Sequence, residues 1–176
     1  MLEAPSIDFY SEKEMQSEFV KRLKNNGWNP IREEVWDTTH KNRVDIFAYH
    51  YAFDNWFCFE LKNNPTTVDY TKALRQMIRY RESIFKYPTE ISCLIVPTFK
   101  HYNYNYEAWI ERFFWRWGFG VGDLASMKVH FVNAETIAIL DLLNPIKPYF
   151  TPKEQIIELK KRINKYWSFE DANTND

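Results

Sequence analysis

The stretches Arg43-Val44-Asp45-Ile46-Phe47 and Phe57-Cys58-Phe59-Glu60-Leu61-Lys62 decide the fold of this chain. Both are short, rich in aromatic and branched residues and bounded by polar residues, which is the composition of β-strands. Residues two apart on a strand face the same side, so Glu60 and Lys62 project together. The residues that alternate with them, Phe57, Phe59 and Leu61, face the other side, where we expect a hydrophobic core.

These two predicted strands bring acidic and basic side chains into one patch if they form an antiparallel hairpin. With the turn near Ala52-Phe53, Asp45 lies opposite Glu60, and Lys62 lies beside them. Carboxylate oxygens are hard ligands that suit Mg²⁺ or Mn²⁺. A neighbouring ammonium can orient a water molecule or neutralise a developing oxyanion. The other interpretation is a cross-strand ion pair on a solvated face of the sheet.

Length and composition narrow the class of protein. With 176 residues, of which 45% are hydrophobic, the sequence predicts one globular domain, 1–176, with its core at about 11–132 and C-terminal helices in 133–167. No apolar run approaches the length of a bilayer span, and the N-terminus lacks signal-peptide features. We therefore expect a cytoplasmic protein with no membrane partner. The net charge of -1 means that any nucleic-acid contact needs a local basic patch.

The pattern along the chain predicts a mixed α/β fold. Three predicted strands follow the first helix, which favours a meander, and later strands are separated by helices, which favours parallel crossovers. We expect a mixed central sheet flanked by helices on both faces. The predicted helices cover 11–26, 68–86, 106–117, 135–143 and 151–166; the predicted strands cover 28–36, 43–49, 56–61, 91–96 and 127–132; a glycine-punctuated turn is predicted at 118–122.

Several of these elements bear the sequence marks of one enzyme family. The first helix carries Glu18, the second strand Asp45, the third strand Glu60-Leu61-Lys62, and the following helix Gln76-Met77-Ile78-Arg79-Tyr80. In this order the four elements resemble the PD-(D/E)XK nuclease superfamily, and the resemblance covers roughly residues 11–132. Val44 stands where the motif has its proline, which ligates nothing in that family.

The resemblance implies a restriction-endonuclease-like αβββαβ core and Mg²⁺-dependent hydrolysis of phosphodiester bonds in DNA, with Mn²⁺ as the alternative ion. It implies that the metal is held by Asp45, Glu60, the Leu61 carbonyl and Glu18. Lys62 would orient or help deprotonate the attacking water. Gln76 and Tyr80 would brace the site or contact the strand that is cut, and Glu33-Glu34 would either add ligands or form a plain pair of charges on an edge strand.

The helix predicted over 68–86 also carries a row of cations. Lys72, Arg75 and Arg79 follow one another at three- and four-residue steps, so they share a face. That face would either contact DNA phosphates or remain an ordinary solvated surface.

The favoured hypothesis is a small stand-alone deoxyribonuclease of viral, mobile-element or DNA-repair type. Two alternatives stay open. One is a Holliday-junction resolvase that acts as a homodimer through the aromatic helix near Trp109–Trp117, where a packed core face is the other interpretation. The second is a catalytically silent nucleic-acid-binding protein with the same fold. The intact set of Asp45, Glu60 and Lys62 favours the enzyme.

Overall fold

Seven strands and two principal helices make up the described part of the chain. The computed structural model describes residues 8–87, 91–98, 110, 113–114, 116–132 and 137–143. The elements in chain order are α1 (Glu12–Asn25), β1 (Ile31–Trp36), β2 (Arg43–His50), β3 (Asn55–Leu61), α2 (Thr67–Glu82), β4 (Ile91–Val96), β5 (Gly120–Asp123), β6 (Lys128–Val132) and β7 (Ile137–Asp141). Within the described residues, no helix combines the length and the apolar character needed to cross a membrane.

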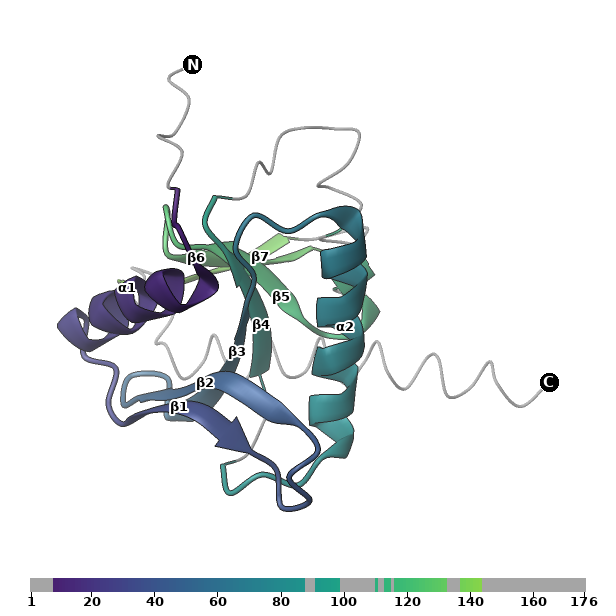
Figure 1. The fold of residues 1–176 in the computed structure, drawn as a ribbon. Helices are drawn as coiled ribbons and strands as arrows, with labels where there is room; N and C mark the ends of the chain where they lie inside the picture. The colour runs from purple at the N-terminus through teal and green to yellow at the C-terminus, as the bar shows by residue number, and fades with distance from the viewer. Residues whose placement is uncertain are drawn as a thin grey trace.

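All seven strands lie in one mixed sheet, and their order in the sheet equals their order in the chain (Figure 1). β1, β2 and β3 form an antiparallel meander. β3, β4 and β5 run parallel, and β5, β6 and β7 are again antiparallel. The predicted meander and the parallel crossover through α2 are therefore confirmed, because a parallel neighbour for β3 requires a long connection.

Helix α1 covers one face of the sheet. Its N-cap is Ser11, whose Oγ accepts from the Glu14 N–H at 3.1 Å. Met15, Phe19 and Leu23 recur at helical spacing and are fully buried. They pack in one hydrophobic cluster with the residues of β3 that face away from Glu60, namely Phe57, Phe59 and Leu61.

Helix α2 covers the opposite face. It begins with a capping box in which Thr66 and Asp69 exchange hydrogen bonds. Leu74, Met77 and Tyr80 are buried in a second cluster that includes Phe47, Cys58 and Leu94 from the sheet. Figure 1 shows α1 and α2 on the two sides of the sheet, as predicted. The helix ends at Glu82 rather than at the predicted residue 86, because Ser83 is extended.

Two predictions in the second half of the chain are wrong. Residues 118–122 do not form only a turn, because Gly120–Asp123 is strand β5. A Cβ on Gly120 would lie 2.4 Å from Val129 Cγ1, so the glycine permits close approach of a neighbouring side chain. The helix predicted over 135–143 is wrong, because within it Ile137–Asp141 pairs antiparallel with β6 as strand β7.

Other predictions fall partly or wholly outside the described residues. In the range 106–117, residues 110, 113, 114 and 116 are described and helical. The predicted C-terminal helix 151–166 lies outside the described residues, and so does Trp109 of the expected aromatic interface.

Candidate functional site

The Asp45 carboxylate lies where β2 and β3 stop pairing through their backbones. The two strands form the predicted antiparallel hairpin with its turn at 51–54, and the last backbone pair before the site is Ile46 with Phe59. Beyond that pair, Asp45 Oδ2 accepts from the Leu61 N–H at 2.8 Å. A side-chain oxygen thus takes over from the strand partner, which places Asp45 beside the end of β3.

Glu60 is held from two sides at the end of β3. Its side chain is only 1% exposed. The Lys62 ammonium donates to Glu60 Oε1 at 2.7 Å, and the Tyr80 hydroxyl lies 2.7 Å from Glu60 Oε2. Gln76 Nε2 donates to the same hydroxyl at 3.3 Å. The structure therefore joins Glu60, Lys62, Gln76 and Tyr80 in one hydrogen-bond network.

The Tyr80 hydroxyl has more acceptors than protons. It lies 2.7 Å from Glu60 Oε2 and 2.7 Å from the Arg43 carbonyl oxygen, and it carries a single proton. When that proton goes to the carbonyl, Glu60 must supply a proton of its own to hydrogen-bond to the hydroxyl. Burial, together with the nearby charge of Asp45, raises the pKa of Glu60 to about 7. The network can therefore hold Glu60 either neutral or ionised near neutral pH.

The surroundings raise the pKa of both neighbouring groups, which disfavours the charged form of Asp45 and favours the charged form of Lys62. Burial raises the pKa of Asp45, and the carboxylate of Glu12 adds to that rise. Burial alone would lower the pKa of Lys62, but the charges of Glu60, Glu12 and Asp45 outweigh it, so the Lys62 pKa is raised. Lys62 is consequently a cation throughout the neutral range, between carboxylates that repel one another.

The acid of α1 that contacts this cluster is Glu12. Glu12 Oε1 lies 3.7 Å from Lys62 Nζ. Glu18, which the family resemblance suggested, instead accepts from Arg22 Nε at 2.8 Å. Arg22 in turn donates to the Leu124 carbonyl at 2.7 Å, so this pair ties α1 to the chain after β5. No family motif marks Glu12, and its position directly after the Ser11 cap is the available sequence signal.

Asn63 explains why the start of α1 reaches Lys62. Asn63 Nδ2 donates to the Phe9 carbonyl at 3.0 Å, which fastens the chain entering α1 to the segment after β3. Asn63 Oδ1 is buried and has no hydrogen-bond partner. A buried acceptor of this kind is ordinarily satisfied by a water molecule or a ligand, and here it follows Lys62 directly.

The donor set fits a magnesium ion that keeps much of its water. Within the described residues no group of three or more His, Cys, Asp or Glu side chains is arranged to hold a metal ion alone. Mg²⁺ is commonly held by one or two carboxylates, with waters and substrate phosphates completing its shell. Asp45 and Glu60 supply two carboxylates. Burial and the charge of Asp45 raise the pKa of Glu60, and a cation beside both carboxylates would offset that repulsion.

The cations of α2 lie on its solvent side. Lys72, Arg75 and Arg79 are all exposed, whereas the opposite side of the helix packs on the sheet. The row is therefore accessible, which is compatible both with contact to DNA phosphates and with an ordinary solvated surface.

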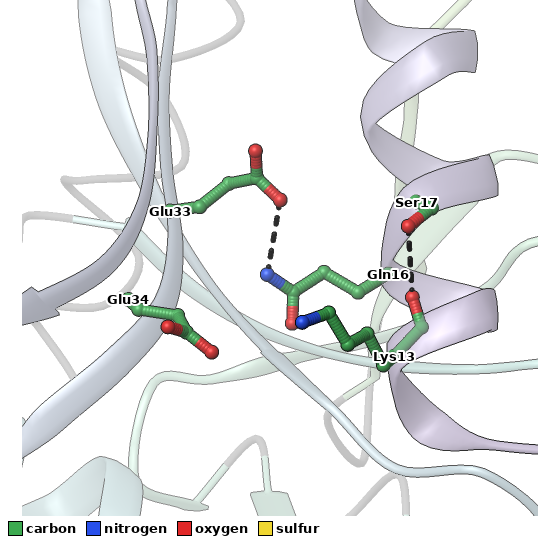
Figure 2. Close-up of a pocket in the computed structure, with 5 residues that line it drawn as sticks. All are labelled: Lys13, Gln16, Ser17, Glu33 and Glu34. Carbon is green, nitrogen blue, oxygen red and sulfur yellow. Dashed lines mark hydrogen bonds between the residues drawn. The ribbon is translucent and has the colours of Figure 1, made fainter.

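A separate polar pocket lies between α1 and β1. Figure 2 shows Lys13, Gln16 and Ser17 on the helix facing Glu33 and Glu34 on the strand. Gln16 Nε2 donates to Glu33 Oε1 at 3.1 Å, and Glu34 Oε1 lies 3.8 Å from Arg43 Nη1. Both acids thus have partners of their own, which favours the interpretation of Glu33-Glu34 as edge-strand charges.

Comparison of the chain with protein-family models, with curated proteins and with solved structures gave no match in any of the three.

Proposed function

We propose that this protein is a divalent-metal-dependent nuclease that hydrolyses phosphodiester bonds in DNA. One observation carries the proposal: the carboxylates of Asp45 and Glu60 lie on neighbouring strands, Asp45 hydrogen-bonded to the Leu61 N–H next to Glu60, and the Lys62 ammonium is hydrogen-bonded to Glu60. Hydrolysis of a phosphodiester needs charge neutralisation and an oriented water more than covalent help from the protein. This site offers places for a cation and for such a water.

The order of elements supports a restriction-endonuclease-like core. α1, β1, β2, β3, α2 and β4 follow one another as αβββαβ, the order that the family resemblance implies. The proposed ligands Asp45 and Glu60 lie on the second and third strands of that series. Gln76 and Tyr80 lie on the following helix, and both belong to the Glu60 network.

Each residue of the cluster has a distinct role in this proposal. Asp45, Glu60 and the Leu61 carbonyl would hold Mg²⁺, or Mn²⁺ in its place. The ion would neutralise phosphate charge and make a bound water more acidic. Lys62, whose raised pKa keeps it charged, orients the attacking water or stabilises negative charge instead of accepting a proton. Glu12 positions the Lys62 ammonium.

Helix α2 supplies residues that hold Glu60 in place and cations that could attract DNA. Tyr80, held by Gln76, fixes the carboxylate of Glu60 at 2.7 Å, which limits its rotation. The exposed row of Lys72, Arg75 and Arg79 supplies local positive charge to a chain of net charge -1. Such a row contacts phosphates without reading sequence.

The test is a cleavage assay with matched variants. Purified protein is incubated with linear, nicked, single-stranded and four-way-junction DNA in Mg²⁺, Mn²⁺ or EDTA. We expect cutting that needs a metal and that falls at least 100-fold in Glu60→Gln and in Lys62→Met, on the order expected when groups that act on the transition state are lost. The exposed Glu82→Gln serves as the control and should cut like the wild type.

The same assay separates the alternatives. Cutting confined to four-way junctions, with a dimeric mass in gel filtration, would identify a junction resolvase. Binding of DNA without cutting in any metal would identify a silent binding protein. Full activity in Glu60→Gln would contradict the proposed site. The carboxylates of α1 are compared directly: Glu12→Gln should reduce cleavage more than Glu18→Gln does.

A further inference from the structure

Trp36 forms a flat aromatic surface at the end of β1. Its side chain is 47% exposed. The guanidinium carbon of Arg43 lies 5.7 Å from the centre of its ring, and the His40 ring lies 6.3 Å away. We call these three residues the aromatic platform. An exposed indole flanked by a cation suits the stacking of a planar, negatively charged partner.

Hydrogen bonds fix the loop between β1 and β2, which joins Trp36 to Arg43. The Asp37 carboxylate, with a side chain only 3% exposed, accepts from the Thr39 N–H at 3.1 Å, the Lys41 N–H at 3.0 Å and Asn42 Nδ2 at 2.9 Å. Burial alone would raise the Asp37 pKa, but these hydrogen bonds hold it well below its ordinary value. Asn42 also donates to Ser83 Oγ at 2.9 Å, which fastens the loop to the end of α2. A fixed backbone on both sides of the platform limits the freedom that is lost on binding.

The aromatic platform adjoins the candidate site. Trp36 is paired with Arg43 across the two strands. Arg43 and Asp45 are two residues apart on β2, about 7 Å along the strand. The Arg43 carbonyl also lies 2.7 Å from the Tyr80 hydroxyl of the Glu60 network. A DNA strand whose phosphate lies at Asp45 would therefore pass close to Trp36.

We propose that the aromatic platform binds an unpaired base of the substrate strand, with Trp36 stacking on the base and Arg43 contacting a phosphate. Arg43 is suited to that contact, because its ion pair with Glu34, at 3.8 Å, is longer than a hydrogen bond. A base inside a duplex is covered on both faces, so the indole can be covered by an unpaired base but not by a base within a duplex. This inference rests on the proposed nuclease function and narrows its substrate class to DNA with single-stranded segments.

The test measures binding without cleavage. The affinity for a fluorescent single-stranded oligodeoxynucleotide, and for a blunt duplex of the same sequence, is measured by anisotropy in EDTA and separately in Ca²⁺. We expect Trp36→Leu to bind the single strand about tenfold more weakly, as for loss of one stacked base, and the duplex unchanged. Trp36→Tyr, which keeps a ring, should stay within about threefold of the wild type.

The control is Tyr51→Ala. Tyr51 is 75% exposed but lies in the β2–β3 turn, at the far end of β2 from Trp36, so its loss should leave both affinities unchanged. Equal single-strand affinity in Trp36→Leu and wild type would overturn the platform, even in a protein that cuts DNA. An equal loss for single strand and duplex would also overturn it. A wild type that binds neither DNA would overturn the platform and the nuclease proposal together.

Discussion

The stability of the metal-free protein should fall with rising pH because of one side chain, Glu60. Its pKa is raised from the ordinary value of 4.5 to about 7 by burial and by the charge of Asp45. A carboxyl whose pKa is higher in the folded state binds its proton more tightly there. Its contribution to stability is therefore full below pH 4.5, is lost as pH rises through 7, and changes little above that.

The size of this loss follows from the pKa difference. Each unit of difference between the pKa in the folded and the unfolded state corresponds to about 1.4 kcal/mol. Complete ionisation of Glu60 should therefore lower the free energy of unfolding by about 3 kcal/mol. The amide in Glu60→Gln does not ionise, yet its oxygen can still accept from Lys62 and its nitrogen can donate to the Tyr80 hydroxyl. The variant should therefore lack this part of the pH dependence.

The assay is urea unfolding in EDTA at a series of pH values from 4.5 to 8. The difference in unfolding free energy between the wild type and Glu60→Gln should change by about 3 kcal/mol over this range, with the wild type losing stability. Asp45→Asn, which removes the repelling charge but keeps an acceptor for the Leu61 N–H, should shift the loss to lower pH. The exposed Glu82→Gln should follow the wild type. A difference that stays constant with pH would refute the reasoning.

Three further predictions concern neighbouring positions. Tyr80→Phe removes a hydroxyl that serves two buried acceptors and should lower the free energy of unfolding by about 1–3 kcal/mol in urea titrations; an unchanged value would contradict the network. Gly122→Ala places a Cβ 2.5 Å from the Lys128 carbonyl oxygen. It should therefore cost about 1–3 kcal/mol in the same measurement. Lys62→Met removes a cation that lowers the Glu60 pKa, so a ¹³C titration of the Glu60 carboxyl should show a higher midpoint than in the wild type; an equal or lower midpoint would exclude that coupling.

The hairpin that carries the site was predictable because its signals are local. Alternation along Phe57–Lys62 fixes which side chains share a face, and the structure has Phe57, Phe59 and Leu61 in the α1 core with Glu60 toward α2. The helix caps at Ser11 and Thr66 are likewise local features, because a cap is decided by a few neighbouring residues.

The errors lie where distant residues decide the outcome. Gly120 and Gly122 carry the composition of a turn, but they lie in β5, which pairs with β4 and β6, and the lack of a Cβ lets β6 approach closely. Residues 137–141 become a strand because β6 is available as a partner, a fact that no local window contains. The contact of Glu12 with Lys62 depends on the direction of α1, which the bond from Asn63 to the Phe9 carbonyl helps to set.

The agreement between strand order and chain order has a consequence for how the protein is made. A strand that emerges from the ribosome finds its sheet neighbour already synthesised, because β2 follows β1 and each later strand adds to the one before it. Growth of the sheet can therefore proceed from the N-terminal end, with no strand inserted between two earlier ones. Pairings between sequence neighbours also lower the average loop to be closed, which favours rapid folding for a sheet of this width.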